Sequence, residues 1–396
     1  MFINRFISRV RSPVSRLSLL APKPLPVTQL KAPTLTEVSR LAGCSKAAAS
    51  AVLNGSRGNI SVSDALRQRV QDIARELNYR PNYASRSLAL RRTQALGIYI
   101  PRGPWSGIGS NYEGHVLHGI ELACVARKYN LSVINMNGNE PPQRCLDTLV
   151  EQRVDGLLVL RVDGDESWLA ELLERRDAVV AIDCHRPLPG LDAVMFNHDD
   201  AIGKAVDHLV GLGHRRIGYL GTCCHQTVPH NELRREAYVK AIVRNGLQLD
   251  PALIFGPEQS PVSVERGNQH LQLAGEYGAG YFVSMGAARP TAIVAYEDLS
   301  ATTAIRFLAD HGLSVPRDIS LVNIEDSRLS RQFMPRLTTV MHPVKEMGQR
   351  AAELLIDRAS TTSGQAARAG VHESFDAELM VRESTAPPSA PTGVTP

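Results

Sequence analysis

The sequence contains no run of eighteen apolar residues, the length that a membrane-spanning helix needs, so a membrane protein is not expected. Its six cysteines include no Cys-x-x-Cys pair, which is unlike a disulfide framework or a zinc site and fits a reducing cytoplasm. Gly107-Ile108-Gly109 lacks the third glycine of a dinucleotide fingerprint, and no Gly-Lys-Ser/Thr phosphate loop is present. We therefore expect no cofactor.

Acidic residues are missing from the first thirty residues, which carry several arginines. The longest apolar run there, residues 19–21, is far too short for a secretory signal. We expect residues 1–32 to be a disordered basic extension, or the result of a misplaced start codon. An organelle transit peptide is the alternative, because such peptides are also rich in Arg and poor in acid.

The charge of the chain is unevenly distributed. Up to Thr93 the sequence holds 16 Lys and Arg against 4 Asp and Glu, a net charge of +12, whereas the remainder holds 28 against 36, a net charge of −8. This polarity predicts a polyanion-binding head on an acidic body. Nucleic acid is the polyanion that we expect.

Three short helices are predicted within residues 33–80. The first starts with a Thr-x-x-Glu capping box at Thr34 and ends at Gly43. The second ends at Asn54-Gly55, and the third begins near Ser63 with apolar residues at helical spacing. Two short helices across a Gly-containing turn are typical of a helix-turn-helix DNA-binding domain, so we expect a small all-α head.

From residue 94 onwards, short apolar runs alternate with helix-like segments. This alternation predicts parallel sheets with helices on both faces. With about ten strands over roughly 290 residues, two sheets fit better than one very wide sheet. We expect a hinge or linker over residues 81–93, an α/β body of two doubly wound parallel-sheet lobes over 94–384, and a disordered tail over 385–396. The predicted strands include Leu96–Ile100, Leu131–Asn135, Gly156–Leu160, Val179–Asp183, Ile217–Leu220, Ala292–Ala295 and Ile319–Ile324.

Several sequence motifs follow one another in a fixed order. The head contains Thr34-Leu35-Thr36-Glu37-Val38-Ser39-Arg40-Leu41-Ala42-Gly43-Cys44-Ser45, Val52-Leu53-Asn54-Gly55 and Leu77-Asn78-Tyr79-Arg80-Pro81-Asn82, and the body contains Gly211-Leu212-Gly213-His214-Arg215-Arg216-Ile217, Asp318-Ile319-Ser320-Leu321-Val322 and Pro335-Arg336-Leu337-Thr338-Thr339-Val340. Over residues 33–385 these motifs resemble the LacI family of transcription regulators. The resemblance implies a helix-turn-helix head and a small-molecule-sensing body.

The resemblance also implies which side chains contact DNA. The second helix would lie in the major groove, with Lys46, Ala47 and Ala51 at the base-reading positions. Family members commonly have Arg where this chain has Ala51, which offers only a methyl group to a thymine; helix propensity alone explains the alanines equally well. The predicted DNA-binding residues are Thr34, Ser45, Lys46, Ala47, Ser50, Ala51, Asn54, Tyr79, Asn82, Arg86 and Leu88.

The segment after the third helix resembles the hinge helix of the family, which folds on DNA and inserts a leucine into a minor-groove step. Leu88 is the predicted wedge, and Arg86 and Arg91 can neutralise nearby phosphates. An ordinary linker is the alternative reading of this segment.

The body resembles the periplasmic-binding-protein type I fold, in which a ligand lies in a cleft between two lobes joined by three crossings. By this resemblance the predicted effector-binding residues are Tyr112, Asp183, Arg234 and Asp298. An Arg between two carboxylates suits vicinal hydroxyls, so a sugar or sugar derivative is predicted, and a structural ion pair is the alternative. Because Glu297 and His198 replace less charged residues of the family, we expect an unusually charged cleft.

A metal or redox site is a further alternative. Cys223-Cys224-His225, together with Cys184, His185 and His230, offers soft ligands. Adjacent cysteines cannot follow the spacing of a zinc knuckle, and cysteines at strand ends are usually inert. We therefore expect no metal site.

These features predict a homodimeric repressor that binds a pseudo-palindromic operator on double-stranded DNA and a small carbohydrate-like effector. We expect it in the bacterial cytoplasm, associated with the nucleoid. No leucine-zipper-like tail follows Glu383, which favours a dimer, and no arrangement of nucleophile, base and oxyanion donors indicates an enzyme. The alternative function is a transport-type sugar-binding receptor, which the body alone would allow.

Overall fold

The computed structural model describes residues 33–54, 62–83, 86–87, 92–101, 111–134, 143–162, 167–175, 178–223, 229–262, 269–360 and 369–389. The chain divides into two compact units, one ending at Arg86 and the other beginning at Ser87. This boundary falls inside the predicted hinge, residues 81–93. The predicted extension over residues 1–32 and the wedge Leu88 lie outside the described residues.

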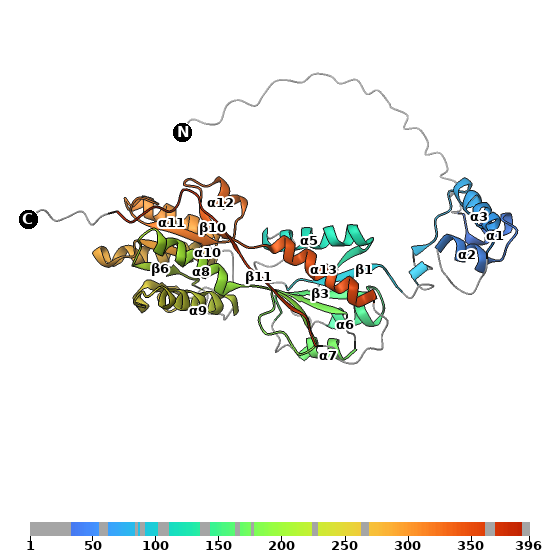
Figure 1. Ribbon diagram of the computed structural model, residues 1–396, viewed down its shortest axis with the longest axis horizontal. Coiled ribbons are helices and arrows are strands. Elements are labelled where there is room, and N and C mark those ends of the chain that lie inside the picture. The colour runs from blue at the N-terminus through green and yellow to red at the C-terminus, as the bar shows by residue number, and fades with distance from the viewer. Residues whose placement is uncertain are drawn as a thin grey trace, which may run out of the picture. The chain divides into compact units, whose positions relative to one another are not determined.

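Within its described residues, the first unit has the helices α1 (Leu35–Leu41), α2 (Lys46–Asn54) and α3 (Asp64–Glu76) (Figure 1). The Thr34 hydroxyl accepts a hydrogen bond of 3.3 Å from the Glu37 amide, and the Ser63 hydroxyl accepts one of 3.3 Å from the Leu66 amide. Both side chains satisfy an amide that the first helical turn leaves without a partner.

A turn and a small apolar core hold these helices together. Gly43 has a φ of 65°, a left-handed conformation that glycine adopts without steric cost, and it connects α1 to α2. Val38, Ala49 and Val70 are completely buried where the three helices meet. The head is therefore the helix-turn-helix bundle that the sequence predicts.

The first lobe of the body is built on a six-stranded sheet in the order β11-β5-β4-β3-β1-β2, with all neighbouring strands parallel. Its strands are β1 (Ala95–Tyr99), β2 (Asn130–Ile134), β3 (Gly156–Leu160), β4 (Val179–Ile182), β5 (Asp192–Phe196) and β11 (His372–Phe375). Every residue of β3 is buried, because helices cover both faces of the sheet. These helices are α5 (Asn111–Arg127) and α13 (Val344–Ser360) on one face, and α6 (Gln143–Val150) and α7 (Ser167–Arg175) on the other.

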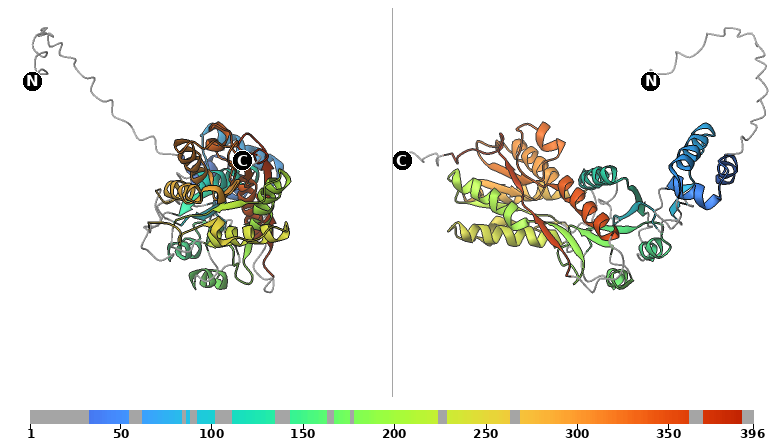
Figure 2. Two further views of the ribbon diagram at one scale, coloured as in Figure 1. Left: turned by 90° about the vertical axis from the view of Figure 1, so that its left-hand side faces the viewer. Right: turned by 45° about the vertical axis from the view of Figure 1, so that its right-hand side comes forward.

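The second lobe repeats this plan with the strand order β12-β10-β9-β8-β6-β7, in which only the β10–β12 pair is antiparallel. Figure 2 shows the helices on the two faces of each sheet. The strands are β6 (Ile217–Leu220), β7 (Ile254–Phe255), β8 (Ala292–Ala295), β9 (Ser320–Ile324), β10 (Thr338–Met341) and β12 (Glu378–Met380). The helices are α8 (His198–Gly211), α9 (Pro229–Arg244), α10 (Gln269–Ser284), α11 (Asp298–Asp310) and α12 (Arg328–Gln332), with short 3-10 turns η1 (Pro251–Leu253) and η2 (Gly286–Ala288).

The chain passes between the two lobes three times. It crosses from β5 to α8, returns from β10 to α13, and crosses again from β11 to β12. The three crossings agree with the resemblance to the periplasmic-binding-protein fold. Among the described residues, no helix is both long and apolar enough to span a bilayer.

The end of the chain differs from the tail expected over residues 385–396. The Thr385 hydroxyl lies 3.0 Å from the His208 ring, and the Ala386 carbonyl lies 2.9 Å from Nε2 of His214. The Ser389 hydroxyl donates to the carbonyl of Arg317 over 2.6 Å. Because these bonds fasten residues 385–389 to the second lobe, the folded body extends to residue 389.

Candidate functional site

The exposed start of α2 carries two of the three predicted base-reading residues. Lys46 and Ala47 are both exposed. Ala51, one turn later, is only 8% exposed and belongs to the buried face of α2. A methyl group that packs against the protein cannot also meet a thymine, so Ala51 does not fit the role predicted for it.

Two predicted phosphate-contacting hydroxyls occupy helix starts. Thr34 caps α1, and the Ser45 hydroxyl accepts a hydrogen bond of 3.1 Å from the Ala48 amide at the start of α2. Ser50 instead accepts a hydrogen bond of 3.0 Å from the side-chain amide of Asn54. The amides at a helix start point outwards and attract anions, so Thr34 and Ser45 lie where a phosphate can bind.

The remaining predicted DNA contacts follow α3. Tyr79 packs against the apolar core of the head, and burial raises the pKa of its hydroxyl. The amide of Arg86 donates a 3.0 Å hydrogen bond to the carbonyl of Asn82, one helical turn earlier, and the Arg86 guanidinium lies 5.7 Å from the ring centre of Tyr83. This helical bond is consistent with a hinge helix.

The body places polar side chains directly after the strands of both sheets. Arg161 follows β3, Asp183 follows β4, Tyr296 follows β8 and Glu325 follows β9. In parallel sheets the carboxyl ends of the strands share one edge, which is where open α/β sheets bind ligands. We call the polar residues that meet between the two sheets the lobe junction: Tyr112, Arg161, Asp183, His185, His198, His230, Arg234, Tyr296, Glu325 and His342.

On the first-lobe side, two of the residues predicted to bind the effector, Tyr112 and Asp183, lie together. The Tyr112 hydroxyl donates a 3.0 Å hydrogen bond to Oδ2 of Asp183. The guanidinium of Arg161 lies 4.4 Å from the Tyr112 ring centre and forms an ion pair with the buried Glu113. Burial opposes ionisation of Asp183, but the electrostatic influence of its neighbours, His185 first and Arg161 among them, holds the pKa of this carboxyl below its ordinary value.

On the second-lobe side, Arg234 is 5% exposed and lies over Tyr296. Its Nη1 donates to the Tyr296 carbonyl over 2.6 Å, and its guanidinium is 4.4 Å from that ring centre. Its Nη2 lies 3.5 Å from Nε2 of His342. In the described part of the chain, Arg234 forms no ion pair with Asp183 or Asp298, so the predicted Arg between two carboxylates is not the arrangement found.

Asp298 is engaged within its own lobe. Its carboxylate accepts hydrogen bonds from the Asn323 amide, from the Ser330 hydroxyl and, over 2.8 Å, from the backbone amide of Ser327. The side chain is 3% exposed. These three bonds join the start of α11 to the end of β9 and the start of α12, so Asp298 positions the loops of the second lobe and does not offer a free carboxylate.

Two glutamates near the junction favour the protonated form. Burial raises the pKa of Glu297 to about 7, although its carboxylate accepts hydrogen bonds from the Leu299 and Ser300 amides. Burial, with repulsion from Asp298, raises the pKa of Glu325 to about 8. The surroundings of the junction are therefore rich in ionisable side chains, but burial favours the neutral forms of Glu297, Glu325 and His198, so the unusually charged cleft predicted from the sequence is not confirmed.

Four histidines complete the lobe junction. Nε2 of His185 lies 3.0 Å from Nδ1 of His230 on the other lobe. Burial, followed by repulsion from Arg234, lowers the pKa of His198 to about 3, and burial also holds the pKa of His230 and His342 well below the ordinary value. The rings of His198, His230 and His342 are therefore uncharged at neutral pH.

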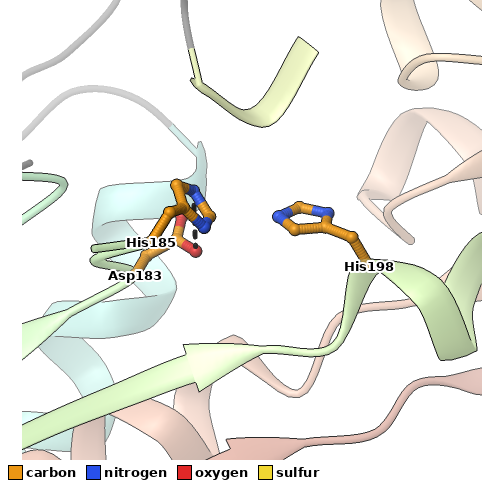
Figure 3. Close-up of side chains that lie close together, drawn as sticks. All are labelled: Asp183, His185 and His198. Atoms are coloured by element: carbon orange, nitrogen blue, oxygen red, sulfur yellow. Dashed lines mark ion pairs between the residues drawn. The ribbon is translucent and has the colours of Figure 1, made fainter. Parts of the chain in front are cut away.

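The soft-ligand set considered from the sequence does not assemble as a whole. Cys184 and Cys223 are buried, whereas Cys224 and His225 lie outside the described residues. His185 is instead grouped with Asp183 and His198, whose ligand atoms all lie within 4.8 Å of one another (Figure 3). No motif in the sequence joins these three residues, because they come from the end of β4 and the start of α8.

Comparison with known proteins covers both units. The family model of bacterial regulatory proteins, lacI family, matches residues 34–82, and the model of a periplasmic binding protein-like domain matches residues 206–385. The transcriptional regulator GalR of Escherichia coli strain K12 is 31% identical over 329 residues, which are 82% of this chain and 88% of the relative. The ribose operon repressor of Haemophilus influenzae is 30% identical over 329 residues, 82% of this chain and 91% of the relative.

Solved structures show the same architecture. The lac repressor dimer bound to operator and the anti-inducer ONPF superimposes with a TM-score of 0.71 at 24% identity, covering 90% of this chain and 100% of that chain. The complex of the regulator CelR with cellobiose gives a TM-score of 0.60 at 25% identity, covering 89% and 99%. The alternative of a transport receptor is not favoured, because the head matches as well as the body. The chain therefore belongs to the lacI family of bacterial regulatory proteins and is a non-catalytic DNA-binding regulator.

Proposed function

We propose that the protein represses transcription as a homodimer on a two-fold symmetric operator, and that a small polar effector at the lobe junction controls its affinity for DNA. The ribose operon repressor of Haemophilus influenzae, at 30% identity, is a repressor by name. The lac repressor structure that superimposes on this chain is that of a dimer bound to its operator. Two heads related by a dyad read two half-sites of opposite orientation. Such a protein acts in the cytoplasm, on the nucleoid.

The DNA half of the proposal places α2 in the major groove. Lys46 is the long polar side chain at its exposed start and can donate to O6 or N7 of guanine, whereas Ala47 offers a methyl group. Thr34 and Ser45 bind phosphates beside the helix starts that they cap. Tyr79, Ser50 and Asn54 support this surface, and the hinge residues Asn82, Arg86 and Leu88 contribute minor-groove and phosphate contacts.

The effector half rests on one observation: buried polar atoms without hydrogen-bond partners gather at the lobe junction. Among the described residues these include Oδ1 of Asp183, both ring nitrogens of His198, Nε of Arg234 and Nδ1 of His342. Each such atom costs free energy unless a ligand or water supplies the missing bond. The unsatisfied atoms therefore mark the place where a polar molecule binds.

The chemistry of these atoms limits the effector to a class. Asp183 and Tyr112 can accept from and donate to hydroxyls, while Arg234 and the neutral imidazoles add donors. A sugar or sugar derivative fits this set. Asp298 acts indirectly, by holding the start of α11 to the end of β9 and the start of α12.

The effector can control operator affinity because the lobe junction lies between the two lobes. An effector that binds one lobe arrangement better than another shifts the population towards that arrangement. The hinge segment directly precedes β1 of the first lobe, so a change in lobe arrangement alters how the two hinges of a dimer meet DNA. The effector thereby changes operator affinity.

Selection of bound duplexes from a random DNA pool tests this function. The full-length protein is expected to enrich one sequence family with two-fold symmetry. A variant in which Lys46 is replaced by Ala should enrich it less. Recovery of unselected sequences, at several salt concentrations, would contradict a sequence-specific repressor.

A further inference from the structure

Three potential metal ligands from two parts of the fold converge at the lobe junction. Asp183 and His185 follow β4, and His198 begins α8. Their ligand atoms all lie within 4.8 Å of one another, with Nε2 of His185 3.9 Å from Oδ1 of Asp183. Figure 3 shows the His198 ring directed across a gap towards the other two side chains.

The ligand atoms on two of these residues lack other partners. His198 is 7% exposed, and within the described part of the chain neither of its ring nitrogens has a hydrogen-bond partner. Oδ1 of Asp183 is likewise without one, although Oδ2 accepts the Tyr112 hydroxyl. A buried imidazole with two unsatisfied nitrogens is costly, so its position calls for a bound species.

We propose that Asp183, His185 and His198 bind a divalent transition-metal ion. Two imidazole nitrogens and one carboxylate oxygen form a set that suits zinc, iron or nickel better than calcium or magnesium, which prefer oxygen ligands. Three protein ligands leave a coordination position open for water or another ligand.

A small movement would close the site around an ion. Bonds of about 2.0–2.2 Å require the ligand atoms to approach one another more closely than they do without it. Because no hydrogen bond to a described residue holds the His198 ring, that ring can turn towards the carboxylate. His230, with Nδ1 3.0 Å from Nε2 of His185, lies close enough to serve as a fourth ligand.

The ion would connect the two lobes. Asp183 and His185 belong to the first lobe, whereas α8 and α9, which carry His198 and His230, pack in the second. A metal bound by residues of both lobes favours one lobe arrangement over others. This regulatory consequence rests on the proposed function; the metal site itself does not.

A titration of the full-length protein tests the site. After removal of metals with a chelator, Zn²⁺ is added in a calorimeter and Co²⁺ is followed by its visible absorption. We expect one ion per chain for each metal, and at least about tenfold weaker binding after His198→Ala, since removing even an indirect metal partner has such an effect. His198→Gln, which keeps the side-chain volume, provides the same comparison if the alanine variant does not fold.

The matched control is His118→Ala on the exposed surface of α5, which should bind the ion like the unchanged protein. Absence of stoichiometric binding, or equal binding by the His198 variants, would overturn the proposal. Weakening by His118→Ala alone would show surface binding and overturn it as well. Because the titration contains no DNA, its failure leaves the repressor function standing, and a failed operator selection leaves the metal site standing.

Discussion

At the scale of single residues, three side chains at or beside the lobe junction lie on strained backbone. Arg161, Asp183 and Glu325 have φ values of 49°, 57° and 102°, in the region that residues with a Cβ rarely adopt. Each such conformation costs roughly 1–3 kcal/mol and persists where the surrounding structure imposes it, often at functional sites. All three residues directly follow a strand, so the strain turns their side chains into the space between the sheets.

Lys46 is expected to carry discrimination between DNA sequences. Lys46→Ala should weaken binding to the selected operator by about 1–3 kcal/mol while changing the affinity for random DNA much less, because base contacts specify and phosphate contacts only position. Fluorescence anisotropy with both duplexes measures the two affinities. Arg69→Ala, an exposed cation on α3, is the matched control. Equal losses on both duplexes would show that Lys46 contacts only phosphate.

Glu325 should make the protein less stable as the pH rises. Its pKa is raised from an ordinary 4.5 to about 8 by burial and by Asp298 and Glu297, against the opposing effect of Arg234 and Arg161. The folded state therefore keeps a proton that the unfolded chain releases. The stability that Glu325 contributes is complete below pH 4.5 and is lost progressively up to about pH 8. Glu325→Gln should remove the loss.

Urea unfolding at pH 5 and pH 8 measures this effect. Between pH 5 and pH 8, the free energy of unfolding of the variant should rise by on the order of 1 kcal/mol relative to that of the unchanged protein. This value is kept low because the Glu325 side chain is partly exposed, and solvent weakens its interactions. A constant difference between the two proteins across this range would contradict the assignment to Glu325.

At the scale of elements, α5 and α13 pack unusually closely through glycines. A Cβ on Gly119 would lie 1.9 Å from the Lys345 carbonyl oxygen, and one on Gly348 would lie 2.3 Å from the Val116 carbonyl oxygen. Both obstacles are backbone atoms, which cannot move aside as a flexible side chain can. The first lobe therefore depends on small residues where its two long helices meet.

Gly119→Ala should destabilise the body by about 2 kcal/mol or more, because the added methyl forces the helices apart. Gly114→Ala on the same helix is the matched control, since nothing lies within 4 Å of its Cβ position. Alanine is the better helix former, so this control should be neutral or stabilising by up to about 1 kcal/mol. Chemical denaturation of both variants measures the difference, and similar values for the two would contradict the close packing.

Asp298 should act on the stability of the second lobe. Asp298→Ala removes the acceptor for Asn323, Ser327 and Ser330 and leaves buried donors unsatisfied, so we expect a loss of about 3 kcal/mol or more. Asp310→Ala, at the exposed end of the same helix, should have little effect. Unfolding curves decide between this role and a direct effector contact, which would weaken ligand binding without a comparable loss of stability.

The sequence predicted elements best where burial leaves a continuous apolar signal. Gly156–Leu160 and Ala292–Ala295 were located to the residue because both faces of these central strands are covered. The edge strands β11 and β12 were not located, since none of their residues is fully buried and neither forms a continuous apolar run. The predicted tail began too early for a related reason: residues 385–389 are held by hydrogen bonds to single partners, which leave no periodic pattern.

At the scale of the whole molecule, the two lobes and their three crossings bring together residues that are far apart in the sequence. Asp183 and Tyr112 were both predicted to bind the effector, and a hydrogen bond joins them, while their contact with an effector stays a prediction. Arg161, His342 and Glu325 were not singled out, although each follows a strand, or nearly so, as Asp183 does. A position directly after a strand could therefore have identified these residues from the sequence. The proximity of His185 to His198 could not be predicted in this way, because it depends on how far apart the lobes lie.

The arrangement of the lobes is also what the proposed control requires. His185 and His230 face one another from different lobes at 3.0 Å, and Arg234 reaches His342 on the second crossing at 3.5 Å. These contacts change whenever the lobes move relative to each other. An effector that replaces them can therefore alter the lobe arrangement and, through the hinges, the binding of DNA.

The central claim, a sequence-specific DNA-binding regulator, is tested most directly by comparing affinities of the full-length protein for its selected duplex and for a scrambled duplex over a series of salt concentrations. The account predicts that the selected duplex binds at least about a thousandfold more tightly at physiological salt, and that both affinities fall steeply as salt rises. Equal affinity for the two duplexes at every salt concentration would contradict it.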